Sequence, residues 1–195
     1  MIVPRDFDAI AIGASAGGVQ ALGVLLPALP AHLRAAVFTV LHLPARQPSL
    51  LVQIFAKRCA LPVCEATDKM PVAAGTLYFA PPDYHLLIDA GPQLALSTDA
   101  AIHHSRPSID ALFESAADIY AERLLAILLT GANEDGAAGL LAVREAGGTT
   151  LVQDPATAQS PQMPAAAVAL GAAGHILPLD AIAALLARLA DNPPP

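Results

Sequence analysis

The chain has no tryptophan, few other aromatic residues and few charged ones: aromatic side chains make up 4% of its 195 residues and charged side chains 14%. Because 55% of the residues are hydrophobic, the core must be built mainly from aliphatic side chains. This composition excludes intrinsic disorder, which goes with low hydrophobicity and high charge. The length suits one domain with a substantial core, and we expect a single domain over residues 1–195.

Cysteine and basic residues are also scarce. Cys59 and Cys64 are too few for a disulfide framework, which favours a reduced, cytoplasmic protein. The net charge of −7 argues against binding to nucleic acid or to an anionic membrane surface. Two uncharged stretches, 9–33 and 155–179, are interrupted by prolines and polar residues, so we expect neither to insert into a membrane and no targeting segment.

What the chain does contain is a regular alternation of short apolar runs and segments with helical periodicity. We predict strands at residues 7–12, 36–41, 61–65, 124–129 and 149–153. We predict helices at 18–29, 49–59 and 107–121, one that follows residues 130–136 and ends at 146, one from 160–161 to about 170, and one at 180–189. Continuous apolar strands between helices are typical of a parallel sheet covered on both faces. Ser105 is the expected N-cap of the helix that begins near Pro107.

Residues 75–98 differ in character, because they have no helical period. Three short runs, 76–79, 84–88 and 93–96, are separated by turn-forming prolines and glycine, which predicts an antiparallel hairpin or meander. We therefore predict an α/β fold: a doubly wound, mostly parallel sheet with helices on both faces and an antiparallel hairpin insert.

A glycine-rich turn follows the first predicted strand. The string Gly13-Ala14-Ser15-Ala16-Gly17 places one serine between a strand and a helix. A serine at such a turn has an exposed hydroxyl beside the first amides of a helix, which suits a nucleophile that needs an oxyanion site. The same string is also compatible with a phosphate-cradling loop or a simple helix cap.

Polar residues follow three of the predicted parallel strands, where ligands bind in open α/β sheets. Ser15, His42 and Asp135 each come just after such a strand. Together they would form a hydrolytic triad of nucleophile, base and orienting acid. Each also has a structural reading: Asp135 is a good helix N-cap, and His42 could be a hydrogen-bonded residue at a strand end. Other candidate acids and bases are Asp83, Asp110, Asp154, His85, His103 and His104.

Two other polar motifs give weaker indications of function. The pair His103-His104 has no Cys, Asp or Glu partners at a recognisable metal-ligand spacing, so we expect no metal and no cofactor. Arg106 lies at a loop–helix junction, where it would either pair with a carboxylate such as Asp110 or face an anionic substrate surface.

Several collinear motifs are more specific. They are residues 12–18 (IGASAGG), 41–44 (LHLP), 78–85 (YFAPPDYH), 105–110 (SRPSID), 129–131 (LTG), 135–139 (DGAAG) and the segment from Gln153-Asp154 to Gln162-Met163-Pro164. Over essentially its whole length the chain resembles the catalytic domain of the chemotaxis-receptor protein-glutamate methylesterase (CheB) family.

The resemblance implies a serine hydrolase that removes methyl groups from glutamate methyl esters on receptor signalling helices, and that can deamidate receptor glutamines. By position, Ser15 matches the nucleophile, His42 the base and Asp135 the acid. The chain order Ser, His, Asp differs from the Ser, Asp, His order of α/β-hydrolases, so that fold is not implied.

The chain departs from the family pattern in places. Ala132 and Asn133 stand where many members have methionine and glycine, and Ala16 stands where threonine is common. We expect Ala16, Ala132 and Arg106 to contribute to oxyanion or substrate binding. Two alternatives remain at this point: a methylesterase-like scaffold with reduced activity, motivated by Ala132 and Asn133, and a nucleotide-binding module that uses residues 13–18. No receiver domain is expected before Phe7.

Overall fold

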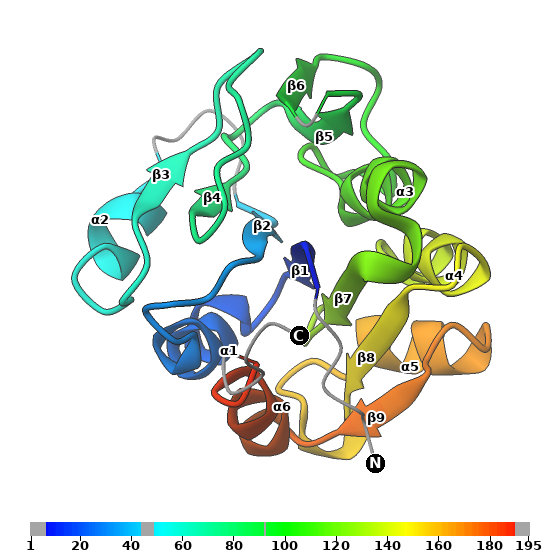
Figure 1. Cartoon of the computed structure of the whole chain (residues 1–195). Coiled ribbons are helices and arrows are strands. Elements are labelled where there is room, and N and C mark those ends of the chain that lie inside the picture. Colours follow the sequence, from blue (N-terminus) through cyan, green and yellow to red (C-terminus); the bar gives the residue numbers. More distant parts are fainter. Residues whose placement is uncertain (1–6, 44–48, 92, 190–195) are drawn as a thin grey trace.

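A parallel sheet forms the centre of the protein. The computed structural model describes residues 7–43, 49–91 and 93–189, so the ends of the predicted domain and Pro44 lie outside the described residues. The strand order is β3-β4-β2-β1-β7-β8-β9, with parallel pairing throughout (Figure 1). The strands are β1 (Ala9–Ala14), β2 (Ala36–Leu41), β3 (Val63–Glu65), β4 (Leu77–Phe79), β7 (Leu124–Leu128), β8 (Thr149–Gln153) and β9 (His175–Leu177).

Helices cover both faces of this sheet, as predicted. One core contains buried side chains of α3 (Ile109–Tyr120), α4 (Ala137–Glu145) and α5 (Gln162–Ala169). The other contains those of α1 (Gly18–Leu25), α2 (Leu51–Phe55) and α6 (Leu179–Leu186). Strand β1 contributes side chains to both cores, because successive side chains of a strand point to opposite faces. Ala9 and Ala11 pack in the core with α3, α4 and α5, and Ile10 and Ile12 pack in the core with α1, α2 and α6.

A separate antiparallel hairpin is formed by β5 (His85–Asp89) and β6 (Gln93–Ser97). This confirms the predicted insert. The first of its three predicted runs, residues 76–79, belongs to the main sheet instead. Residues 77–79 form β4, which pairs in parallel with β2 and β3 in the main sheet. Turn residues on either side of a short run do not reveal which sheet it joins, and all three residues of β4 are buried as a central strand requires.

Two further details differ from the sequence-based predictions. The N-cap of α3 is Ser108, whose side chain accepts a hydrogen bond from the Ala111 amide; Ser105 lies three residues earlier in the loop. The edge strand β9 had no clear signal, since it is three residues long and none of them is fully buried. Three short 3₁₀ segments, η1 (Leu26–Ala28), η2 (Ala121–Arg123) and η3 (Pro155–Thr157), complete the described structure.

The register of the three central strands sets up the site. In β1 and β2, Ala14 pairs with Leu41, and in β1 and β7, Gly13 pairs with Leu128. The three strands therefore end at nearly the same level on one edge of the sheet. The chain reverses its winding direction at these strands, which is where open α/β sheets bind ligands.

Candidate active site

The glycine-rich turn places Ser15 directly after β1. Its backbone N–H donates to the carbonyl of Thr130, at 2.9 Å, which extends the sheet pairing by one residue. Gly17 then adopts a left-handed conformation, with φ of 79°, and α1 begins at Gly18. Only glycine enters that region without strain, so the chain turns from strand to helix within three residues and leaves the serine at the strand end.

The other glycines of the turn are explained by close packing. A Cβ atom on Gly13 would lie 2.3 Å from Ile109 Cγ2, and one on Gly18 would lie 2.4 Å from Leu41 Cδ1. The glycine pattern thus lets α3 and β2 approach the turn. A phosphate ligand is not needed to account for it, which removes the main motive for the nucleotide-binding alternative.

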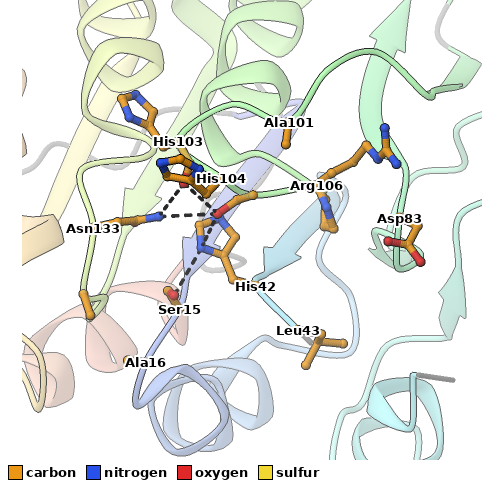
Figure 2. Close-up of a pocket in the computed structure, with 13 residues that line it drawn as sticks. Ser15, Ala16, His42, Leu43, Asp83, Ala101, His103, His104, Arg106 and Asn133 are labelled. Carbon is orange, nitrogen blue, oxygen red and sulfur yellow. Dashed lines mark hydrogen bonds between the residues drawn. The ribbon is translucent and has the colours of Figure 1, made fainter. Parts of the chain in front are cut away.

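His42 lies between Ser15 and Asp135, one residue after β2. Figure 2 shows Ser15 beside His42. Its Nδ1 is 3.1 Å from Ser15 Oγ and its Nε2 is 2.7 Å from Asp135 Oδ2. Because the carboxylate only accepts, Nε2 carries the proton, and the lone pair on Nδ1 is free to accept the proton of the serine hydroxyl. The structure therefore brings together the three residues predicted from the strand ends.

Asp135 is fully buried, in the loop after β7. Besides His42, its carboxylate accepts hydrogen bonds from Ser108 Oγ and Ile109 N, both at 2.7 Å, and from Asp110 N at 3.1 Å. Burial alone would raise the pKa of Asp135, but these four hydrogen bonds outweigh it and the pKa lies below its ordinary value. The acid is ionised at neutral pH and fixed at the N-terminus of α3, where the helix dipole favours a negative charge.

Ser108 and Thr130 support the site and were missed by sequence reasoning. Ser108 caps α3 and also orients Asp135, so one side chain fixes both the helix start and the acid. Thr130 Oγ1 donates to the carbonyl of Ala16 at 2.8 Å and so ties the turn of Ser15 to the loop of Asp135. The signal for Ser108 was available: serine is a preferred N-cap, and the motif 105–110 contains two serines.

The triad opens into a cavity of about 750 Å³ on the carboxyl edge of the sheet. Ser15, Ala16 and Ala132 all line it, as do His103, Arg106 and Asn133. Within the described part of the chain, the backbone amides of Ala16 and Ala132 have no hydrogen-bond acceptor. Backbone N–H groups without an acceptor, on residues that line the same cavity as a serine hydroxyl, are candidates for an oxyanion site.

Comparisons with known proteins agree with this geometry. A family model described as CheB methylesterase matches residues 10–186. The chain belongs to the CheB methylesterase family. A relative from Leptospira interrogans is 41% identical over 187 residues, covering 96% of this chain and 97% of the relative. Another, from Pseudomonas aeruginosa and named protein-glutamate methylesterase/protein-glutamine glutaminase 2, is 42% identical over 93% of this chain and 52% of its own length.

The solved structure of the Thermotoga maritima CheB methylesterase catalytic domain has the same fold. It superimposes with a TM-score of 0.89 at 32% sequence identity, covering 95% of this chain and 100% of the Thermotoga domain. The doubly wound sheet with a hairpin insert is thus the architecture of a CheB methylesterase.

In this CheB methylesterase Arg106 binds backbone carbonyls in place of the predicted carboxylate partner Asp110. Its Nη1 donates to the backbone carbonyls of Thr98, at 2.9 Å, and Asp99, at 3.0 Å, and Asp110 is not its partner. The side chain thereby fastens the end of the β5–β6 hairpin to the loop that borders the cavity. It also lines the cavity, so a role toward substrate remains a prediction.

Four of the competing acids and bases, His85, Asp154, Asp110 and His103, have other partners. His85 is buried and accepts from Ser108 N while donating to the carbonyl of Ala100, which is a structural role. Asp154 caps η3. Asp110 accepts from Gly139 N at 2.6 Å, and His103 Nε2 lies 3.5 Å from its Oδ2. Burial raises the pKa of Asp110 to about 6, opposed by the Gly139 amide and aided by the charge of Asp135.

Two further observations concern the described ranges 7–43, 49–91 and 93–189. No cluster of three or more His, Cys, Asp or Glu side chains in them is placed to hold a metal ion. None of their helices has both the length and the apolar character needed to cross a membrane.

Proposed function

We propose that this protein is a cytoplasmic serine hydrolase that demethylates glutamate methyl esters on the signalling helices of chemotaxis-type receptors and releases methanol. The observation that carries the proposal is the hydrogen-bonded series Ser15–His42–Asp135 at the mouth of a cavity. Relatives named protein-glutamate methylesterase/protein-glutamine glutaminase supply the substrate class, and they add deamidation of receptor glutamines as a second reaction. The catalytic unit is proposed to be the single domain 1–195.

The reaction follows from the positions of the three side chains. Ser15 Oγ attacks the ester carbonyl while His42 Nδ1 takes its proton, and Asp135 stabilises the resulting imidazolium. Nδ1 then returns the proton to the departing methoxide, which leaves as methanol. Water, activated by the same nitrogen, hydrolyses the glutamyl–serine ester and regenerates Ser15 with a free glutamate side chain.

Backbone amides provide the proposed oxyanion site. Ala16 and Ala132 line the same cavity as Ser15, and no hydrogen-bond acceptor is found for their backbone N–H groups within the described chain. Since the donors are backbone groups, alanine at 16 and 132 retains them. This supports an active enzyme over the scaffold with reduced activity, because the departures from the family pattern change side chains and leave the donors in place.

The decisive experiment is methanol release from a methylated receptor. We expect release by the wild-type protein and a loss of roughly 10⁴- to 10⁶-fold in Ser15→Ala, the range seen when a serine hydrolase loses its nucleophile. Ser97→Ala, on β6, is the matched control and should retain wild-type turnover. Ammonia release from the receptor carrying glutamine at the same sites measures the second reaction.

Two results would contradict the proposal. Equal methanol release by wild type and Ser15→Ala would exclude Ser15 as the nucleophile. No release by the wild type, together with no labelling of Ser15 by a fluorophosphonate, would favour the scaffold alternative.

A further inference from the structure

A second hydroxyl group lies beside the proposed catalytic base. Ser105 Oγ is 3.3 Å from His42 Nδ1, the same nitrogen that faces Ser15 Oγ at 3.1 Å. Ser105 belongs to the loop before α3 and is not part of the triad. Figure 2 shows Ser15, His42, Asn133 and His103 gathered at the cavity, with dashed lines for the hydrogen bonds among the residues drawn. One ring nitrogen thus has two hydroxyl neighbours, and only one of them is the nucleophile.

The neighbours of Ser105 determine which way its hydroxyl points. Asn133 Nδ2 donates to Ser105 Oγ at 3.4 Å, and an amide nitrogen can only donate. The carbonyl of His103 can only accept and lies 3.4 Å from the same oxygen. Since the lone pair of His42 Nδ1 is used by the hydroxyl of Ser15, the proton of Ser105 goes to this carbonyl. A hydroxyl has one proton and two lone pairs, so the proton and one lone pair are used. The remaining lone pair faces His42 Nδ1.

Asn133 is itself held in this orientation. Its Oδ1 accepts a hydrogen bond from the backbone N–H of Asp135 at 3.3 Å, which fixes the oxygen of the amide toward the acid loop. The nitrogen is thereby directed to Ser105 and to the His103 carbonyl, at 3.4 and 3.5 Å. The orientation of Ser105 therefore depends on the same loop that carries the catalytic acid.

This arrangement interacts differently with the two protonation states of His42. In the resting site Nδ1 carries a lone pair, and a second lone pair on Ser105 Oγ gives no hydrogen bond. Once Nδ1 has taken the proton of Ser15 it becomes a charged donor, and Ser105 Oγ is an acceptor already in place. An interaction that strengthens only as the reaction proceeds lowers the barrier, whereas one made equally in the ground state would not.

We infer that Ser105 is a positioning residue that stabilises the protonated form of His42 through a hydroxyl oriented by Asn133 and the His103 carbonyl. The inference rests on the proposed function, because it assigns a role within that reaction. It predicts that Ser105 affects turnover more than substrate binding. It also excludes Ser105 as an alternative nucleophile, since its proton points away from the base.

The test compares Ser105→Ala and Ser105→Thr in the full chain, with methanol release from methylated receptor as the readout. A hydrogen bond to a charged group contributes enough for roughly a tenfold fall in kcat in Ser105→Ala, with KM unchanged. Ser105→Thr keeps the hydroxyl and should restore most of the rate. Ser97→Ala is the matched control, and melting temperatures of all variants show that the fold is retained.

A double-mutant cycle tests the part played by Asn133. If Asn133→Ala acts by releasing the Ser105 hydroxyl, its effect on kcat should be smaller in the Ser105→Ala background than in the wild type. Independent, additive effects of the two substitutions would overturn this part of the inference.

The outcomes separate the two proposals. Wild-type kcat in Ser105→Ala, or a kcat in Ser105→Thr as low as in Ser105→Ala, would overturn the role of Ser105 while Ser15-dependent methanol release still supports the hydrolase. Fluorophosphonate labelling of Ser105 in the Ser15→Ala variant would show that its hydroxyl is activated as a nucleophile, contrary to the orientation inferred here. An inactive, unlabelled wild-type protein would instead contradict the proposed function itself.

Discussion

Two adjacent carboxylates at the start of α3 have opposite responses to burial. Asp135 accepts four hydrogen bonds, and its pKa is lowered although it is fully buried. Asp110 accepts from the Gly139 amide and faces the charge of Asp135, and burial raises its pKa to about 6 from an ordinary value of 3.8. The number of donors around each carboxylate decides the direction. The loop geometry therefore places the ionised carboxylate of Asp135 at the site, while the neighbouring Asp110 has a pKa of about 6.

The raised pKa of Asp110 makes a prediction about stability. A native state that binds a proton more tightly than the unfolded chain loses stability as pH rises from about 4 to 6. Asp110→Asn removes this loss and keeps an acceptor for Gly139 N–H. We expect the variant to be more stable than wild type at pH 7 by on the order of 1–2 kcal/mol, with the difference shrinking toward pH 4.

Thermal unfolding of both proteins between pH 4 and pH 7 measures that difference. Asp154→Asn, which changes a carboxylate that caps η3, serves as the control for the loss of one negative charge elsewhere in the protein. The lowered pKa of Asp135 contributes stability above about pH 4 that is lost on acidification, so both proteins lose stability at the acid end of this range. A difference between Asp110→Asn and wild type that is constant with pH would contradict the prediction.

At the scale of elements, α3 links folding to the site. Its N-cap, Ser108, accepts from Ala111 N and donates to Asp135 Oδ1, and the next two amides complete the carboxylate's shell. Ser108→Ala should therefore lower stability by about 0.5–2 kcal/mol, as loss of a helix cap does. It should also reduce kcat, because the acid loses one of the donors that fix its position.

The control for this prediction is Ser49→Ala. Ser49 Oγ accepts from Leu51 N at the start of α2, and among the described residues it shares no hydrogen bond with the triad. Chemical denaturation and methanol release, measured on both variants, should show a stability loss in each and a loss of turnover only in Ser108→Ala. Unchanged turnover in Ser108→Ala would mean that the remaining donors suffice to hold Asp135.

The elements also show what the sequence could predict and what it could not. Ser15, His42 and Asp135 were recognisable because each follows a long apolar run, and parallel strands bring their carboxyl ends to one edge. The assignment of residues 77–79 to the main sheet depends on pairing with β2 and β3, which are distant in sequence. Ser105 and Ser108 have the same local capping propensity, and the helix start at Ile109, where Asp135 also binds Ser108, makes Ser108 the cap.

At the scale of the whole molecule, the central sheet and the hairpin differ in burial. Every residue of β1 and β7 is buried, and β1 pairs on both sides. In β6 only one of five residues is buried, and β5 and β6 form a two-stranded sheet of their own. We expect amide hydrogen exchange to be slowest in β1 and β7 and faster in the hairpin, above all in β6, since local opening is easiest where few groups are buried.

Hydrogen exchange measured by mass spectrometry or NMR resolves these segments. The Ser15→Ala variant should give the same pattern, because the substitution removes a hydroxyl at the cavity and no core packing. Equal protection of the hairpin and the central strands would contradict the prediction and indicate that the domain opens only as a unit.

The common level at which β1, β2 and β7 end restricts how the chain can vary in length. Adding or removing one residue within β2 would shift its pairing with Ala9–Ala14 and rotate the side chain after Leu41 to the other face of the sheet. Loops at the opposite edge, such as residues 30–35 and 146–148, set no such register. Insertions and deletions in this protein should therefore be tolerated at the amino edge of the sheet and eliminated by selection within these strands.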